Sequence, residues 1–161
     1  MLKLTSIAIA AVLAIAAAST AKAQGAYEKK NYNYSEWTKG LFSEAVTVVN
    51  PGKFIFLAGV GAEDEAGKRG DIRHPGDLMG QCRYAYDKIK RALAANGATF
   101  NDVVKIVTYV TDMRYVIDVG KCRTEAFGDA PAPAHTLLNV SQLAWPGMMV
   151  EVDVTAVTAA K

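Results

Sequence analysis

The stretch DLMGQCRYAYDKIKRALAANGATFNDVVKIVTYVTDMRYVIDVGKCRTEAF, residues 77–127, decides the fold because it predicts two helices with one strand between them. In residues 77–96 the apolar side chains recur at helical spacing, an aspartate begins the segment and a glycine follows it. Residues 103–110 are rich in β-branched side chains, which favour a strand. Residues 112–127 return to helical spacing, and their first residue is suited to cap a helix.

Strand patterns flank this stretch on both sides. Residues 44–49 and 53–59 are rich in β-branched and aromatic side chains, and the turn residues Asn50-Pro51-Gly52 separate them, which predicts a β-hairpin. Beyond two prolines, residues 134–140 predict a strand. Residues 150–155 alternate apolar with polar side chains, as in a strand with one face in the core.

The predicted order, β-β-α-β-α-β-β, indicates an α+β fold in which one mixed sheet carries both helices on one face. The opposite face of such a sheet needs a cover, which a partner subunit usually supplies. We expect a single domain over residues 40–161. Residues 24–39 are polar and aromatic without periodicity, which predicts an irregular N-terminal arm that folds back on the domain or packs on a neighbour.

The first 23 residues have the layout of a secretory signal peptide. Lys3 precedes an apolar run to Ala18 that is too short to span a bilayer well, and Ala21-Lys22-Ala23 is a small-x-small cleavage signal before Gln24. A membrane anchor is the alternative, but no basic cluster follows the run. The mature protein is therefore expected to be periplasmic or secreted and free of the membrane once the signal is removed.

Charge and cysteine content narrow the function classes. The chain has a formal net charge of +2, and Lys3 and Lys22 lie in the expected signal peptide, so the mature chain is neutral and lacks the basic footprint of a nucleic-acid-binding protein. Cys82 and Cys122 do not form a metal motif. They form one disulfide between the two helices, or they are two small buried thiols, and the sequence leaves both open.

Two charged clusters are expected to face solvent. The acids at 63–65 lie in a glycine-rich loop over residues 60–75, and their spacing fits no calcium-binding loop. Lys88, Lys90 and Arg91 are interpreted as one solvated helix face.

Segments along the chain resemble the Rid family of small deaminases, also known as YjgF or RidA. Residues 40–46 (GLFSEAV) resemble a family segment that is usually GPYSQAV. The further matching segments, in chain order, are residues 54–59 (FIFLAG), 80–97, 102–105 (DVVK), 109–113 (YVTDM), 133–136 (PAHT) and 150–152 (VEV). Their order and spacing together are specific, and the resemblance covers about residues 40–157.

The resemblance implies a chorismate-mutase-like α+β fold and a homotrimer with small-molecule sites in the clefts between subunits. It also implies hydrolysis of reactive enamines and imines, such as 2-iminopropanoate, to a 2-oxo acid and ammonia. No metal and no organic cofactor is expected. A ribonuclease activity, also attributed to the family, is disfavoured by the neutral mature chain and its export.

The main departure from the family is His135, which stands where the motif has an arginine. That arginine clamps the substrate carboxylate through two parallel hydrogen bonds, and a histidine cannot reproduce the fork. The loss is worth on the order of 2–3 kcal/mol of carboxylate binding. The resemblance places His135 in the cleft; the alternative is a buried strand histidine bonded to the backbone.

The resemblance implies roles for four other residues. Glu151 matches a glutamate near the substrate and an attacking water, where it acts as a general acid and base; the alternative is a strand glutamate facing solvent. Phe42 stands where a tyrosine is common, and Lys121, with the preceding glycine, replaces a site asparagine. Gly59 is interpreted as a backbone position near the ligand or as a turn glycine.

Two functions have support from particular residues, whereas a third, a holdase-like or structural role that the resemblance suggests, is supported only by the apolar composition. One is an exported enamine or imine deaminase with a specificity altered at His135. The other is a non-catalytic homotrimer that binds a small metabolite in the same cleft. The retained Glu151 favours the enzyme, and the lost arginine and asparagine favour the binding protein.

Overall fold

The computed structural model describes residues 25–160, so the expected signal peptide, residues 1–23, lies outside the described residues. The elements in chain order are β1 (Glu28–Tyr32), η1 (Glu36–Thr38), β2 (Ala45–Val49), β3 (Lys53–Val60), α1 (Leu78–Ala95), η2 (Phe100–Asp102), β4 (Val103–Val110), η3 (Met113–Tyr115), α2 (Val116–Phe127), β5 (Ala134–Asn139) and β6 (Val150–Thr158). Among them, no helix combines the length and the apolar composition needed to cross a membrane.

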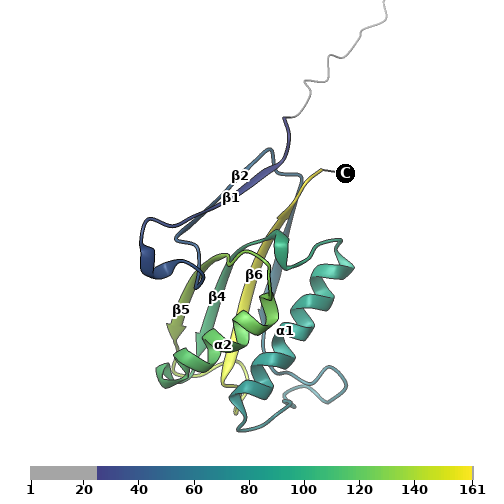
Figure 1. Ribbon diagram of the computed structural model, residues 1–161. Helices are drawn as coiled ribbons and strands as arrows, with labels where there is room; N and C mark the ends of the chain where they lie inside the picture. The colour runs from purple at the N-terminus through teal and green to yellow at the C-terminus, as the bar shows by residue number, and fades with distance from the viewer. Residues whose placement is uncertain (1–24, 161) are drawn as a thin grey trace, which may run out of the picture.

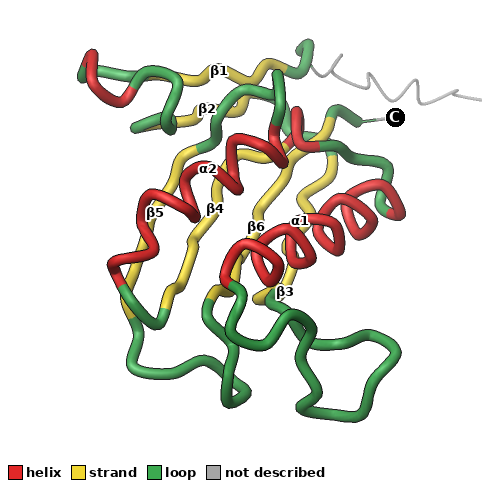
Figure 2. Tube along the Cα trace, turned by 60° about the horizontal axis from the view of Figure 1, so that its bottom comes forward, coloured by secondary structure: helices red, strands yellow, loops and turns green. Residues whose placement is uncertain are grey.

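The predicted mixed sheet is confirmed. Four strands lie in the order β3-β6-β4-β5, with β4 and β5 parallel and the other neighbours antiparallel. Figures 1 and 2 show α1 and α2 in front of the same face of this sheet. The sheet therefore has a helix face and an open face, and these two terms are used below.

The core lies between the sheet and the helices. On β6, Val150, Val152 and Val154 are at most 2% exposed, whereas the residues between them are only partly buried, as the alternation in the sequence predicts. On α1, Ile89 and Leu93 are fully buried against them. Burial of each such side chain is worth about 1.5–3 kcal/mol, so this layer holds the helices on the sheet.

A disulfide bond joins the two helices. Cys82 of α1 and Cys122 of α2 are bonded, with their Cα atoms 6.4 Å apart, and both side chains are buried. Of the two states that the sequence left open, the structure contains the bridged one.

The predicted hairpin over residues 44–59 is wrong. β2 and β3 both form, but β2 pairs with β1 in a separate two-stranded sheet, and β3 pairs with β6. Asn50 adopts a positive φ of 50°, and the amide of Gly52 donates to Thr158 O at 2.9 Å. A Cβ at Gly52 would overlap the backbone of Ala160. The turn therefore brings the start of β3 directly against the end of β6, and a side chain at position 52 would prevent this approach.

The N-terminal arm is not irregular, because it contains β1. The strand pairs along its length with β2, and the arm folds back on the domain. Tyr27 OH donates to Val157 O at 2.8 Å, and Lys29 Nζ donates to Val103 O at 3.0 Å. Asn31 Nδ2 donates to Ser43 Oγ at 2.9 Å. These bonds explain how a polar segment without apolar periodicity becomes ordered.

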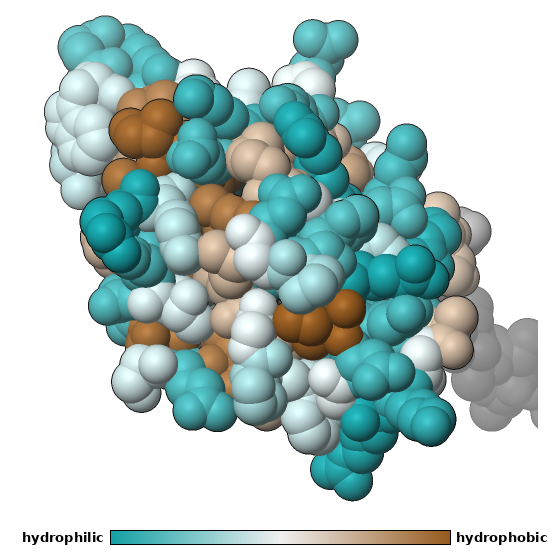
Figure 3. Space-filling model, turned by 90° about the horizontal axis from the view of Figure 1, so that it is seen from below, coloured by the Kyte–Doolittle hydropathy of each residue, from teal (hydrophilic) through white to brown (hydrophobic). Residues whose placement is uncertain are grey.

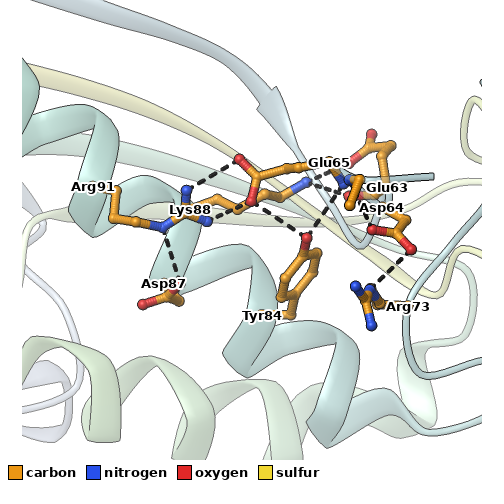
Figure 4. Close-up of polar contacts among 9 residues, drawn as sticks. Glu63, Asp64, Glu65, Arg73, Tyr84, Asp87, Lys88 and Arg91 are labelled. Atoms are coloured by element: carbon orange, nitrogen blue, oxygen red, sulfur yellow. Dashed lines mark hydrogen bonds and ion pairs between the residues drawn. The ribbon is translucent and has the colours of Figure 1, made fainter.

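The acidic loop is tied to α1 and is not freely solvated. Figure 4 shows Glu63 and Glu65 reaching Lys88 and Arg91, at 3.0 and 2.5 Å between charged atoms. Lys90 and Arg91 are exposed, as expected of a solvated helix face, but the side chain of Lys88 is only 12% exposed and does not belong to that face. This end of the molecule is otherwise mostly hydrophilic, with apolar residues in separate spots (Figure 3).

Candidate functional site

The residues singled out in the sequence form two groups on opposite faces of the sheet. His135 on β5 is level with Ile106 of β4, whose side chain is fully buried in the core, so His135 lies on the helix face. Glu151 lies between the buried Val150 and Val152, so its side chain lies on the open face, level with Tyr109 of β4. Within one chain these groups do not meet.

The first group lines a cavity of about 820 Å³ between the N-terminal arm, α2 and β5. Phe42, Lys121 and His135 all border it. The Phe42 ring lies edge-on to the His135 ring, with centroids 6.3 Å apart. Lys121 extends from α2 with a largely exposed side chain and lies 3.4 Å from Asp118. The sequence therefore selected three residues of one cavity from three separate segments.

Hydrogen bonds within the arm hold this wall of the cavity in place. Glu44 accepts from the amides of Tyr34 and Ser35 at 2.6 and 2.9 Å, which fixes the start of η1. Asn33 Nδ2 donates to Phe42 O at 2.7 Å, so the backbone that carries the Phe42 ring is anchored. Trp37 on η1 then packs edge-on to Phe42, with centroids 5.7 Å apart.

His135 is a neutral hydrogen-bond acceptor. Its Nδ1 lies 2.5 Å from Arg123 Nη1, and because a guanidinium only donates, Nδ1 accepts and the proton resides on Nε2. Nε2 then donates to Thr108 Oγ1 at 3.1 Å. Burial, followed by the charges of Arg123 and Lys105, lowers the pKa of His135 to about 3. His135 thus bonds to side chains and not to the backbone, and near neutral pH it carries no charge for a substrate anion.

Sequence reasoning missed Arg123, which lines the same cavity. It is only 7% exposed, and its Nη2 donates to Leu41 O at 2.6 Å. A signal was present, because Arg123 follows Val116 by seven residues and Val119 by four, which places it on the buried side of the helix. A charged residue on an apolar helix stripe seldom lacks a specific partner.

The second group consists of Glu151 and Gly59. The strand pairing between β3 and β6 shifts register between Leu57 and Val60, and Gly59 lies in that irregularity. A Cβ at Gly59 would overlap the Glu151 carboxylate, so the glycine leaves room for that side chain and is not simply a turn residue.

The Glu151 carboxyl has the electrostatics of a proton-transfer group. Burial raises its pKa, and the negative charges of Glu63 and Asp153 raise it further. Among the described residues, no side-chain hydrogen bond or ion pair holds Glu151, which leaves its oxygens available. Neighbouring Tyr109 on the same face donates to Asp153 at 3.1 Å.

A metal site has no support in the described part of the chain. No three His, Cys, Asp or Glu side chains within residues 25–160 gather in a way that could hold an ion. The described residues bring together an apolar cavity with a buried arginine on one face of the sheet and a carboxyl group with a raised pKa on the other.

Comparison with known proteins gives consistent matches. The family model described as endoribonuclease L-PSP matches residues 36–158. A RutC family protein of Pyrococcus horikoshii is 32% identical over 117 residues, which are 73% of this chain and 86% of that protein. A RutC family protein of Escherichia coli, YjgH, is 30% identical over 109 residues, covering 67% of this chain and 78% of that protein. The crystal structure of the Rid family protein YyfB from Yersinia pestis matches with a TM-score of 0.70 at 26% identity, covering 81% of this chain and 98% of that one.

Proposed function

The chain belongs to the endoribonuclease L-PSP family, which includes the Rid, YjgF and RutC proteins, and from that premise we propose that it is an exported enamine or imine deaminase of altered specificity. The reaction is hydrolysis of a reactive imine to a carbonyl compound and ammonia. It requires an acid and base at the C=N bond and a binding surface for the rest of the substrate.

The observation that carries the proposal is the position of Glu151, whose carboxyl lies on the open face beside Gly59 without a side-chain partner among the described residues, where burial raises its pKa. As a carboxylate, Glu151 takes a proton from a water that adds to the imine carbon. It returns that proton to the nitrogen, which gives a carbinolamine, and then carries the hydroxyl proton of the carbinolamine to the same nitrogen, so that the C–N bond breaks, ammonia leaves and the carbonyl forms. A pKa raised toward neutrality suits a group that must both accept and donate a proton.

The split of the candidate residues between two sheet faces supports a homotrimer with intersubunit clefts. His135 and Glu151 cannot contact one ligand within a chain, because the sheet lies between them. A second copy placed against the open face would bring its own cavity residues to Glu151. The proposed small-molecule ligand therefore lies between subunits.

The test couples an amino-acid oxidase to the protein and follows the decay of the imine that the oxidase releases. Glu151→Gln keeps the size of the side chain and removes its proton transfer, so hydrolysis above the spontaneous rate should be lost. Glu65→Gln is the matched control, because Glu65 is an exposed acid held by Arg91. Equal rates for wild type and Glu151→Gln would refute the catalytic role.

A second candidate function is non-catalytic binding of a small metabolite by the same trimer. It is favoured by the neutral His135, which removes the charge that the family places at this position. Absence of hydrolysis in wild type with every imine tested, together with saturable ligand binding, would support this candidate over the enzyme.

Export is part of the proposal and is supported by the sequence of residues 1–23. Intact-mass measurement of the exported protein should give a chain that begins at Gln24. Residues 1–23 retained on the exported protein would contradict the signal peptide.

A further inference from the structure

Arg123 is a buried cation with unused hydrogen-bonding capacity. A guanidinium has five N–H donors, and the hydrogen bonds of Arg123 go to His135 Nδ1 and Leu41 O. Both acceptors are neutral, since His135 accepts as an uncharged imidazole. Among residues 25–160, no carboxylate forms an ion pair with Arg123.

A buried cation without a counter-charge is costly, and proteins pair such groups or use them to bind anions. Burial lowers the pKa of Arg123, but arginine's ordinary pKa is so high that the group stays charged. Arg123 itself lines the cavity, beside His135 and Leu41. A ligand in that cavity can therefore supply the counter-charge that the chain itself does not.

The other residues that line the cavity indicate which chemical group is attached to the negatively charged group of the ligand. Its lining is mainly aromatic and aliphatic: Trp37, Leu41, Phe42, Val116, Ile117 and Leu137. Trp37 and Ile117 are 69% and 65% exposed, so a large apolar surface lies open beside the guanidinium. Lys121, the other cation at the rim, is already paired with Asp118 and is exposed.

We propose that Arg123 is the anion-binding residue of this protein and that the ligand is a carboxylate with a bulky apolar body. The carboxylate accepts from the free N–H groups of Arg123, and the body packs on Trp37, Phe42 and the apolar side of α2. In this chain the anion-binding group is thus carried by α2 in place of β5. The assignment deepens the proposed function, on which it rests for the identity of the site.

His135 holds the guanidinium of Arg123 in the orientation that anion binding needs. His135 Nδ1 orients the guanidinium by accepting from Nη1, and an arginine at position 135 could only donate. Histidine at 135 and arginine at 123 are therefore a matched pair: each fits because of the other.

The experiment measures binding by titration calorimetry with three probes at fixed ionic strength. The probes are 3-phenylpropanoate, its neutral amide 3-phenylpropanamide, and propanoate, which has the charge without the body. Wild type should bind 3-phenylpropanoate roughly tenfold or more tighter than either other probe, because an Arg–carboxylate pair and a buried ring each contribute at least that factor.

Arg123→Gln should lower the affinity for 3-phenylpropanoate roughly 10- to 100-fold, to the level of the amide, and leave amide binding unchanged. Arg91→Gln is the matched control, because it removes the same charge from an exposed site on α1 and should leave all three affinities unchanged. If Arg123→Gln fails to fold, the wild-type preference for the acid over the amide decides the matter.

Equal binding of acid and amide by wild type, or no binding of 3-phenylpropanoate at millimolar concentration, would overturn the proposal. So would an Arg123→Gln protein that keeps the preference for the acid. These outcomes are separate from failure of the deaminase assay. Binding needs no turnover, and Glu151→Gln should abolish hydrolysis while 3-phenylpropanoate still binds.

Discussion

The side chain at position 135 determines which hydrogen bonds its neighbours Arg123 and Thr108 can form. Arginine donates at every nitrogen, whereas neutral histidine offers one acceptor and one donor. His135 uses both, linking Arg123 of α2 to Thr108 of β4 across the helix face of the sheet. Burial of the ring is the main reason why the pKa of His135 is low, and the positive charges of Arg123 and Lys105 lower it further. Protonation of the ring would also break the bond from Arg123.

This bonding predicts a specific dependence of stability on pH. An unfolded histidine titrates near pH 6.5 and His135 in the folded chain near 3, so between these values unfolding takes up a proton. The free energy of unfolding should therefore fall as pH decreases below about 6.5, by up to about 1.4 kcal/mol per pH unit from this group. The contribution is fully present above that range.

The matched variant is His135→Gln, whose amide oxygen accepts from Arg123 and whose amide nitrogen donates to Thr108 without titrating. Urea denaturation at several pH values should show a shallower acid-side decline for the variant, with similar stability for both proteins near pH 8. Parallel declines would show that His135 does not take up the proton.

At the scale of elements, the sequence predicted those segments whose periodicity is set by the core. α1, β4 and α2 were located to within a few residues, because burial against one layer imposes regular spacing on their apolar side chains. The pairing of strands was not predictable in the same way. A turn such as Asn50-Pro51-Gly52 indicates a change of direction, but only tertiary contacts decide that β3 pairs with β6.

The candidate site also contains residues that the sequence predicted and residues that it did not. Phe42, Lys121 and His135 were assembled from the family resemblance, and the structure places them around one cavity. Neither β1 nor the position of Arg123 in the site was predicted from the sequence, because both depend on polar partners that are distant along the chain. β1 is held by bonds to backbone far along the chain, and Arg123 by Leu41 O and His135. The sequence does not identify such partners, although the spacing of Arg123 from Val116 and Val119 does place it on the buried side of α2.

The disulfide between α1 and α2 predicts a measurable share of stability. The bridge closes a loop of 40 residues, which is worth roughly 3–4 kcal/mol in the unfolded-chain entropy model. The double variant Cys82→Ala/Cys122→Ala should lose about that free energy of unfolding. A reducing agent should lower wild-type stability to a similar degree and leave the variant unaffected.

Thiol counting on denatured, unreduced protein provides the independent check on the bridge. It should find no free thiol, because Cys82 and Cys122 are the chain's two cysteines and are bonded to each other. Two free thiols per chain would contradict the bridge.

At the scale of the whole molecule, the open face of the sheet carries apolar side chains that the chain itself leaves exposed. Phe54 and Phe56 of β3 are 52% and 73% exposed there, with their rings stacked at 6.2 Å between centroids. Leu138 on β5 is a further exposed apolar residue on this face. The helices cover the other face, and a second chain placed on the open face would bury these side chains.

The last prediction follows from that exposure. Phe56→Glu places a charge where the proposed trimer would bury an aromatic ring, so light scattering of the mature variant should give a smaller species than the wild-type trimer. Because Glu151 and the cavity would then lie in separate molecules, hydrolysis should fall with the oligomer. Ala94→Glu is the control, since Ala94 is exposed on α1, on the other side of the sheet, and should leave the oligomer intact. A wild-type protein that stays monomeric at micromolar concentration would contradict both the trimer and its intersubunit site, whereas a Phe56→Glu trimer with full activity would move the interface away from β3.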